Sequence, residues 1–112
     1  MRLQAARRPK PARATGIGEL ERKAAEAARL LKLLANENRL LILCRLAVAG
    51  EMSVGNLANA VDLSQSALSQ HLAKMREDGL VATRREAQVV FYRIADPNAA
   101  RLLALLKSIY CP

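Results

Sequence analysis

The sequence predicts a mainly α-helical domain that carries one β-hairpin just before its last helix. Of the 112 residues 52% are apolar, mostly leucine and alanine, and only 3% are aromatic, which is typical of packed helices. Apolar residues of segment 20–34 repeat at spacings of four and three, the period of an amphipathic helix. Segment 80–96, LVATRREAQVVFYRIAD, is instead rich in the β-branched and aromatic residues that strands prefer. A chain of this length is expected to form one domain.

The first part of the chain differs in composition from the rest. Residues 1–18 contain two prolines, two glycines and no periodicity, and the only charges before Glu19 are basic. We therefore expect a disordered basic tail over 1–18 and a folded domain over 19–112. The net charge of +8 favours a polyanionic partner, most commonly nucleic acid. The tail either contacts DNA phosphates or has no specific role.

Capping residues mark the boundaries of the predicted helices. The apolar stripe of the first helix ends before Asn36, which is expected to cap a second helix over 37–49 that Gly50 terminates. The remaining caps are Ser53 for helix 54–61, Ser64 for helix 65–78, which Gly79 closes, and Asp96 with Pro97 for the last helix.

In the last third of the chain, the residue pattern changes from that of helices to that of strands. Two strands with a turn near residues 86–88 fit segment 80–96, so the order becomes five helices with a hairpin before the last. The first and last helices carry more apolar surface than one small core needs. A symmetric homodimer that buries both is the expected solution.

The two short helices separated by VDLS form a helix-turn-helix pattern. In the second of them Leu68, Leu72 and Met75 follow helical spacing and are expected to face the core. The opposite face carries small and amide side chains that can approach the major groove and hydrogen-bond base edges. The DNA-binding candidates of this helix are Ser64, Gln65, Ser66, Ser69 and Gln70. The competing interpretation is a solvated polar face with N-cap serines.

A strand pair directly after such a helix is the layout of a winged helix, written ααααββα. Arg84, Arg85 and Gln88 would lie at or near the wing, within reach of phosphates or the minor groove. A hairpin with solvated arginines is the alternative. His71 lies at the edge of the buried face, and we expect it to pack or to contact a phosphate rather than to read a base.

Other classes of function are disfavoured by the composition. One histidine, one phenylalanine, two tyrosines and no tryptophan leave few groups for an enzyme pocket, so we expect no catalytic residue. No segment reaches the ~18 consecutive apolar residues of a membrane span, and no apolar run follows the basic N-terminus. Two cysteines do not make a secreted disulfide framework, which favours the cytoplasm. A thiol oxidoreductase would need a C-x-x-C motif or a cysteine with a nearby base, and neither is visible. A third alternative is a winged helix used only for protein contacts.

Three segments, LANENRLLILCRL, SVGNLANAVDLSQSALSQHLAKMREDGLV and REAQVVFYRI, resemble the ArsR-type winged-helix repressors. The resemblance implies a homodimer built from the first and last helices, a palindromic operator in double-stranded DNA, and release by an inducer. Most of the family sense metals, with cysteines at the start of the third helix or acids and histidines along the last. Here EMSVGNLANAVD has no cysteine or histidine, and NAARLLALLKSIYCP has no histidine or carboxylate. We expect no metal cofactor, although a site shared between subunits stays open.

One branch of the family is more similar to this chain. The persulfide- and polysulfide-responsive repressors typified by BigR and SqrR have one cysteine in the second helix and one just past the last helix, as Cys44 and Cys111 are placed here. The resemblance implies that sulfane sulfur links these redox-sensing thiols, weakens operator binding and so controls sulfide detoxification genes. Metal- or peroxide-responsive repression is the alternative. A buried, inert Cys44 is also open from the residues alone.

Overall fold

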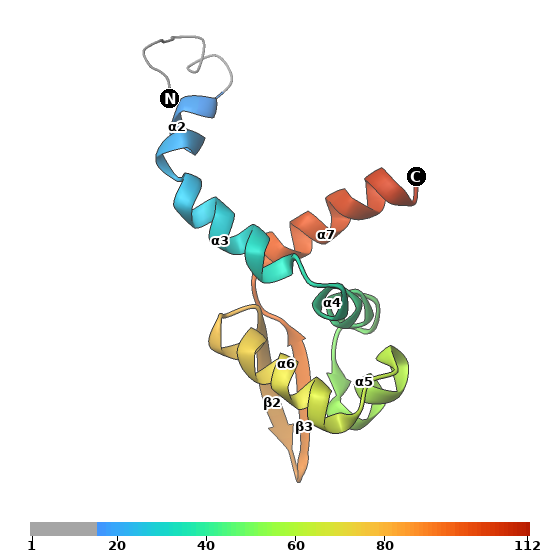
Figure 1. Cartoon of the computed structure of the whole chain (residues 1–112). Coiled ribbons are helices and arrows are strands. Elements are labelled where there is room, and N and C mark those ends of the chain that lie inside the picture. The colour runs from blue at the N-terminus through green and yellow to red at the C-terminus, as the bar shows by residue number, and fades with distance from the viewer. Residues whose placement is uncertain (1–15) are drawn as a thin grey trace. The chain divides into compact units, whose positions relative to one another are not determined.

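The computed structural model describes residues 16–112, and most of the predicted tail 1–18 lies outside this part. The chain divides into two compact units, one ending at Leu31 and one running from Lys32 to Pro112. The elements follow one another as α2 (Ile17–Arg22), α3 (Ala24–Leu34), α4 (Glu37–Ala49), β1 (Met52–Ser53), α5 (Val54–Val61), α6 (Gln65–Glu77), β2 (Val81–Glu86), β3 (Val89–Ile94) and α7 (Pro97–Tyr110) (Figure 1). The predicted order of helices and hairpin is therefore confirmed. No helix of the described segment is long and apolar enough to cross a membrane.

The first predicted helix is interrupted at one residue. It begins at Ile17, two residues before the predicted start of the folded domain at residue 19, and is divided at Lys23, whose φ of −107° and ψ of 14° leave the α region. The Lys23 N–H donates to the Leu20 carbonyl at 2.9 Å and to the Glu19 carbonyl at 3.2 Å, so the hydrogen bonding tightens locally to the i−3 pattern. No proline or glycine stands there, and periodicity alone did not reveal the break.

The helix caps form as the sequence predicts. Each capping side chain accepts a hydrogen bond from a backbone N–H of the first helical turn and thereby satisfies a donor that has no partner within the helix. These bonds run from Arg39 to Asn36 at 3.1 Å, from Asn56 to Ser53 at 3.3 Å, from Ala67 to Ser64 at 3.1 Å and from Asn98 to Asp96 at 2.8 Å.

The sheet has three antiparallel strands in the order β1-β3-β2, one more than predicted. β2 and β3 pair from Val81↔Ile94 to Glu86↔Val89, which confirms the hairpin and its turn. The additional strand β1 is two residues long and pairs with the middle of β3, with Ser53 opposite Phe91. So short a strand has no periodicity of its own, because it exists only through its long-range partner.

The core lies between α4, α5, α6 and the base of the sheet. Its largest fully buried side chains are Ile42, Leu43, Leu46, Leu57, Leu68, Leu72, Met75 and Leu80. The predicted core positions of α6 are thus confirmed, since Leu68, Leu72 and Met75 are all 0% exposed. Their burial fixes which face of α6 remains free.

The two-residue loop of the hairpin holds a strained residue. Ala87 has a φ of +56°, in the left-handed region that costs a residue with a Cβ atom roughly 1–2 kcal/mol. Ala87→Gly is therefore expected to raise the free energy of unfolding by about 0.5–1 kcal/mol, measured by urea denaturation. Ala73→Gly, on the exposed face of helix α6, is the matched control and should lower it by about 0.5–1 kcal/mol. A lower free energy of unfolding in both variants would contradict the strain assigned to Ala87.

Candidate functional site

The exposed face of α6 carries the predicted base-reading residues. The predicted residues Gln65, Ser66, Ser69 and Gln70 are all exposed, and Ser64 is exposed at the cap. They lie on the side of the helix away from the buried Leu68, Leu72 and Met75. Small and amide side chains in this position let the helix backbone approach a base edge while offering donors and acceptors. The N-terminal end of the helix also presents free N–H groups.

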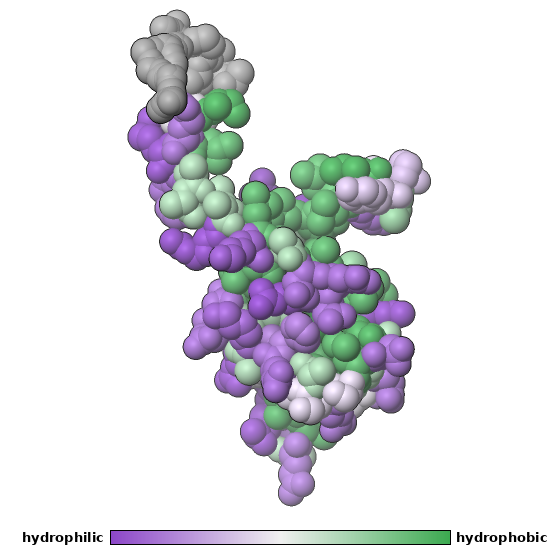
Figure 2. All heavy atoms as spheres, viewed as in Figure 1, coloured by the Kyte–Doolittle hydropathy of each residue, from purple (hydrophilic) through white to green (hydrophobic). Residues whose placement is uncertain are grey.

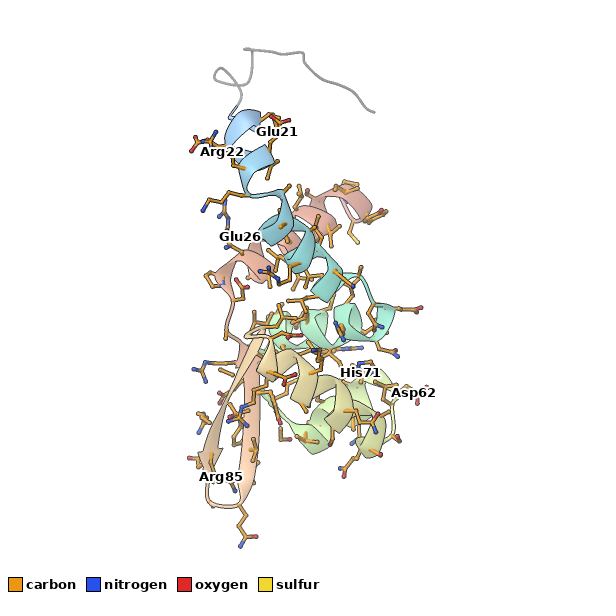
Figure 3. The ribbon with its side chains drawn as sticks, turned by 60° about the vertical axis from the view of Figure 1, so that its left-hand side comes forward. Glu21, Arg22, Glu26, Asp62, His71 and Arg85 are labelled. Atoms are coloured by element: carbon orange, nitrogen blue, oxygen red, sulfur yellow. The ribbon has the colours of Figure 1, made fainter. Side chains whose placement is uncertain are left out.

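The preceding turn orients this helix. α5 ends at Asp62, which takes the left-handed conformation with φ of 55° and ψ of 47°, and Ser64 caps α6 two residues later. A residue in the left-handed conformation ends helix α5 and changes the chain direction within the turn. Aspartate tolerates this conformation better than most residues. His71 is half-buried on α6 (Figure 3), which agrees with its predicted place at the edge of the buried face. Whether it contacts a phosphate stays a prediction.

On the hairpin, Arg84 is held by a carboxylate that sequence reasoning missed. Its Nη2 lies 2.6 Å and its Nε 2.9 Å from Oε1 of Glu51, and Nη1 lies 3.5 Å from Oε1 of Glu86. The guanidinium also lies 4.6 Å from the centre of the Phe91 ring, a cation–π contact. The side-chain hydrogen bond lowers the pKa of Glu51 and raises that of Arg84. Glu51 stands 33 residues earlier in the chain, immediately before the unpredicted strand β1, so no local signal pointed to this pair.

Arg85 and Gln88 remain free where Arg84 does not. Neither makes a hydrogen bond or ion pair with another side chain in the part of the chain that the structure describes, and both are exposed near the hairpin tip. Figure 3 shows Arg85 close to that tip, and in Figure 2 the tip is hydrophilic. Successive strand residues point to opposite faces, so Arg85 leaves the sheet on the side away from Arg84. The structure thus divides the predicted wing residues into two free side chains and one with internal partners.

The Glu51–Arg84 pair should make stability depend on pH. A carboxylate whose pKa is lowered in the folded state adds stability above its unfolded pKa, and that stability is lost as the pH falls through the folded pKa. We expect Glu51→Gln to lower the melting temperature slightly at neutral pH, and the difference to disappear in acid, measured by thermal unfolding from pH 7 to pH ~3. Glu77→Gln, in an exposed pair with Lys74 at 3.6 Å, is the control for removal of a surface carboxylate and should leave the melting temperature at neutral pH nearly unchanged. The same dependence of melting temperature on pH in the two variants would contradict a stabilising role of the Glu51–Arg84 pair.

A second site lies between α4 and α7. A groove of about 740 Å³ is lined by residues of both helices, and both cysteines contribute to it. Cys44 comes from α4, and Cys111 is the residue that ends α7, where its N–H donates to the Lys107 carbonyl at 2.7 Å. Both thiols are exposed and unbonded. Residues 67 positions apart are therefore brought to one apolar groove, with Leu40, Ala47 and Val48 on one wall and Ala100, Leu103 and Ala104 on the other.

Across residues 16–112 there is no group of three or more histidine, cysteine, aspartate or glutamate side chains placed to hold a metal ion. Lys107 is the only charged residue that lines the groove in the same part of the chain. The chemistry that this site offers is accordingly that of two thiols in apolar surroundings.

Capped helices, an exposed polar face on α6 and a hairpin beside it define a winged helix-turn-helix DNA-binding domain. The family description "Bacterial regulatory protein, arsR family" matches residues 36–83, from the cap of α4 into β2. HlyU of Vibrio cholerae, a transcriptional activator, is 53% identical over 95 residues that cover 85% of this chain and 87% of HlyU. The chain belongs to the arsR family of bacterial regulatory proteins, and it is a DNA-binding transcriptional regulator rather than an enzyme.

Solved structures agree with this family. The reduced form of the same HlyU superposes with a TM-score of 0.76 at 52% identity, covering 84% of this chain and 98% of HlyU. The transcriptional repressor BigR from Xylella fastidiosa gives 0.79 at 42% identity, covering 85% of this chain and 96% of BigR. A homodimeric winged helix-turn-helix DNA-binding domain from Mycobacterium bovis gives 0.68 at 34% identity, covering 94% and 89% of the two chains. The predicted winged-helix fold is thus confirmed.

Proposed function

We propose that the protein is a homodimeric repressor that leaves a palindromic operator when Cys44 and Cys111 react with persulfide or polysulfide. One observation carries the proposal: the two thiols line a single groove, one from the body of the domain and one from the end of α7. A thiol pair in separate surroundings would offer no such linkage. The similarity to the repressor BigR supports the repressing direction of control, whereas the similarity to the activator HlyU leaves room for the opposite sign at some promoters.

The dimer rests on apolar surface that one chain leaves uncovered. On α7 the side chains of Leu105, Ile109 and Tyr110 are 54%, 56% and 78% exposed, and Figure 2 shows hydrophobic residues along this helix. Leu20 and Leu31 of the predicted apolar stripe of the first helix are also exposed. Large exposed apolar side chains on a helix are typical of a subunit interface. The homodimeric relative supports the same assembly here.

A sulfur bridge between the thiols would tie α7 to α4. It would close a loop of about 67 residues, and the chain-entropy model gives such a bond roughly 4 kcal/mol. Stability alone does not regulate, because the bond matters only if the linked arrangement fits the operator worse than the open one. A difference of about 1–3 kcal/mol between the two arrangements suffices for regulation. Since α7 is the proposed dimer helix, a changed position of α7 would alter the spacing of the two recognition helices.

The test is operator binding by fluorescence anisotropy on reduced protein and on samples treated separately with polysulfide, hydrogen peroxide and zinc. Intact mass is recorded on every sample. We expect loss of binding with polysulfide alone and a mass that corresponds to two lost hydrogens and at least one added sulfur atom. Loss with peroxide and only two lost hydrogens would make the protein a general disulfide switch. Loss with zinc alone would return it to the metal-responsive repressors, with ligands shared between subunits.

The DNA contacts make a separate prediction. Gln70→Ala is expected to weaken operator binding by about 1–3 kcal/mol and random-sequence binding hardly at all, because Gln70 lies on the exposed, base-reading face of α6. Arg85→Ala is the control, since a phosphate contact should weaken both DNAs alike and reduce the salt slope by about one. The dissociation constants for operator and random-sequence DNA are measured by anisotropy titrations over a range of salt concentrations. Equal losses on the two DNAs for Gln70→Ala would count against base readout.

A further inference from the structure

We propose that the groove between α4 and α7 selects neutral, apolar carriers of sulfane sulfur, such as dialkyl trisulfides, over charged carriers such as glutathione trisulfide. This inference rests on the proposed thiol switch and names the class of reagent that reaches it. The switch requires only that both thiols react. The lining of the groove decides how quickly each reagent arrives there.

The surroundings of the two thiols carry the argument. Cys44 and Cys111 lie mostly among leucine, alanine and valine side chains of both helices, and the polar side chains of the lining in the described part of the chain are those of Lys107 and Tyr110. The side chain of Lys107 is exposed, so its ammonium stays hydrated and attracts anions only weakly. The volume of about 740 Å³ lies within the range of small-molecule sites, ~300–1,000 Å³. There is room for a trisulfide with two short alkyl arms.

The two reagent classes differ in the free energy of moving their arms from water into the groove. Alkyl arms leave water and bury against the alanine and leucine side chains, which is favourable for each methylene group. The carboxylates and ammonium groups of a glutathione arm gain nothing from the apolar walls and lose part of their hydration, and Lys107 and the Tyr110 hydroxyl are the only polar side-chain partners besides the thiols in the described lining. Apolar arms therefore place the central sulfur between the thiols more often. The reaction itself is the same for both classes.

The chemistry balances without any further oxidant. The thiolate of Cys44 attacks the central sulfur of R–S–S–S–R and expels one R–S⁻, which leaves a mixed trisulfide in which the former central sulfur is bonded to Sγ of Cys44 and to the sulfur of the remaining S–R arm. The thiolate of Cys111 then attacks the former central sulfur and expels the second R–S⁻. The two cysteines are oxidised and joined through one sulfur atom, and the trisulfide is reduced to two thiols that take up the two protons. The reverse attack order gives the same product.

The experiment compares dipropyl trisulfide with glutathione trisulfide on the reduced full-length protein. The rate of internal bridging is followed by intact mass and divided by the rate of each reagent with a free small thiol, which removes their intrinsic reactivity. We expect the normalised rate of dipropyl trisulfide to be at least about tenfold higher. Ala104→Gln places an uncharged polar amide in the groove and should reduce this preference. Ser108→Gln, one turn later on α7 and outside the lining, should keep it.

The outcomes separate this inference from the proposed switch. Equal normalised rates, or a faster glutathione trisulfide, would overturn the selectivity and leave the switch intact. Inorganic polysulfide serves as a small reagent with no arms, and Ser108→Gln should leave its rate within about twofold. An equal change in the rates of dipropyl trisulfide and glutathione trisulfide in Ala104→Gln would overturn the role of the groove. Failure of every reagent, inorganic polysulfide included, to form a bridge would remove the switch itself.

Discussion

Replacing Leu72 by alanine is expected to lower the free energy of unfolding by about 3 kcal/mol, within the range of ~2–5 kcal/mol for buried leucines. Leu72 is 0% exposed and belongs to the row of side chains that attaches α6 to the core. Its truncation removes apolar contacts and leaves a cavity that the surrounding helices fill only in part. The measurement is urea denaturation of the reduced protein at one fixed protein concentration, because the stability of a dimer depends on concentration.

The matched control for Leu72 is another leucine on a helix of the same unit. Leu41 on α4 is 44% exposed, and Leu41→Ala is expected to cost less than about 1 kcal/mol. The Leu72 variant should also lose operator affinity at higher temperature, since this packing orients the exposed face of α6 that we propose to read bases. Similar losses of stability in the two variants would contradict the assigned core.

Local signals in the sequence predicted most of the fold. Asn36, Ser53, Ser64 and Asp96 each satisfy a backbone donor a few residues away, so the cap can be identified without knowing the rest of the structure. The apolar spacing of α6 likewise determines its buried face. Elements whose cause lies within one or two helical turns are therefore predictable from sequence alone.

Features that depend on distant partners were missed. β1 exists because Met52 and Ser53 meet Tyr92 and Phe91 across the sheet, and its two residues carry no pattern. The same pairing places Glu51 beside Arg84, which turned a predicted wing arginine into one with internal partners. Composition shows that the carboxylate is present, but only the sheet register shows what it meets.

The thiol site depends both on local sequence signals and on partners that are distant in the sequence. Spacing assigned Cys44 to a helix and Cys111 to the end of another, yet nothing in either segment states that the two helices share a groove. The family resemblance proposed the pairing, and the groove between α4 and α7 supplies an independent physical reason for it. The exposure of both thiols adds that small reagents have access to them in a single chain.

Cys111→Ser is expected to leave operator binding of the reduced protein unchanged and to prevent its release by polysulfide. The cysteine is exposed at the end of α7, so serine should be tolerated without loss of stability. In the unmodified sequence, polysulfide should weaken operator binding by about 5–150-fold, the usual range of allosteric coupling. The variant should lose this effect, because Cys44 alone acquires sulfur but has no second thiol to which it can be linked. Anisotropy titrations before and after treatment, with intact mass on the same samples, measure both consequences.

Cys44→Ser should behave in the same way, with the added sulfur found on Cys111. Ser108→Ala is the control on α7, since it changes a neighbouring exposed hydroxyl that donates to the Leu105 carbonyl at 2.7 Å and keeps both thiols. This control should release the operator as fully as the unmodified sequence does. Release by a single-cysteine variant would show that modification of one thiol is enough, and the bridge between α4 and α7 would then have no regulatory role. If both single-cysteine variants keep the operator bound after polysulfide treatment and Ser108→Ala releases it, the two thiols must act as a pair.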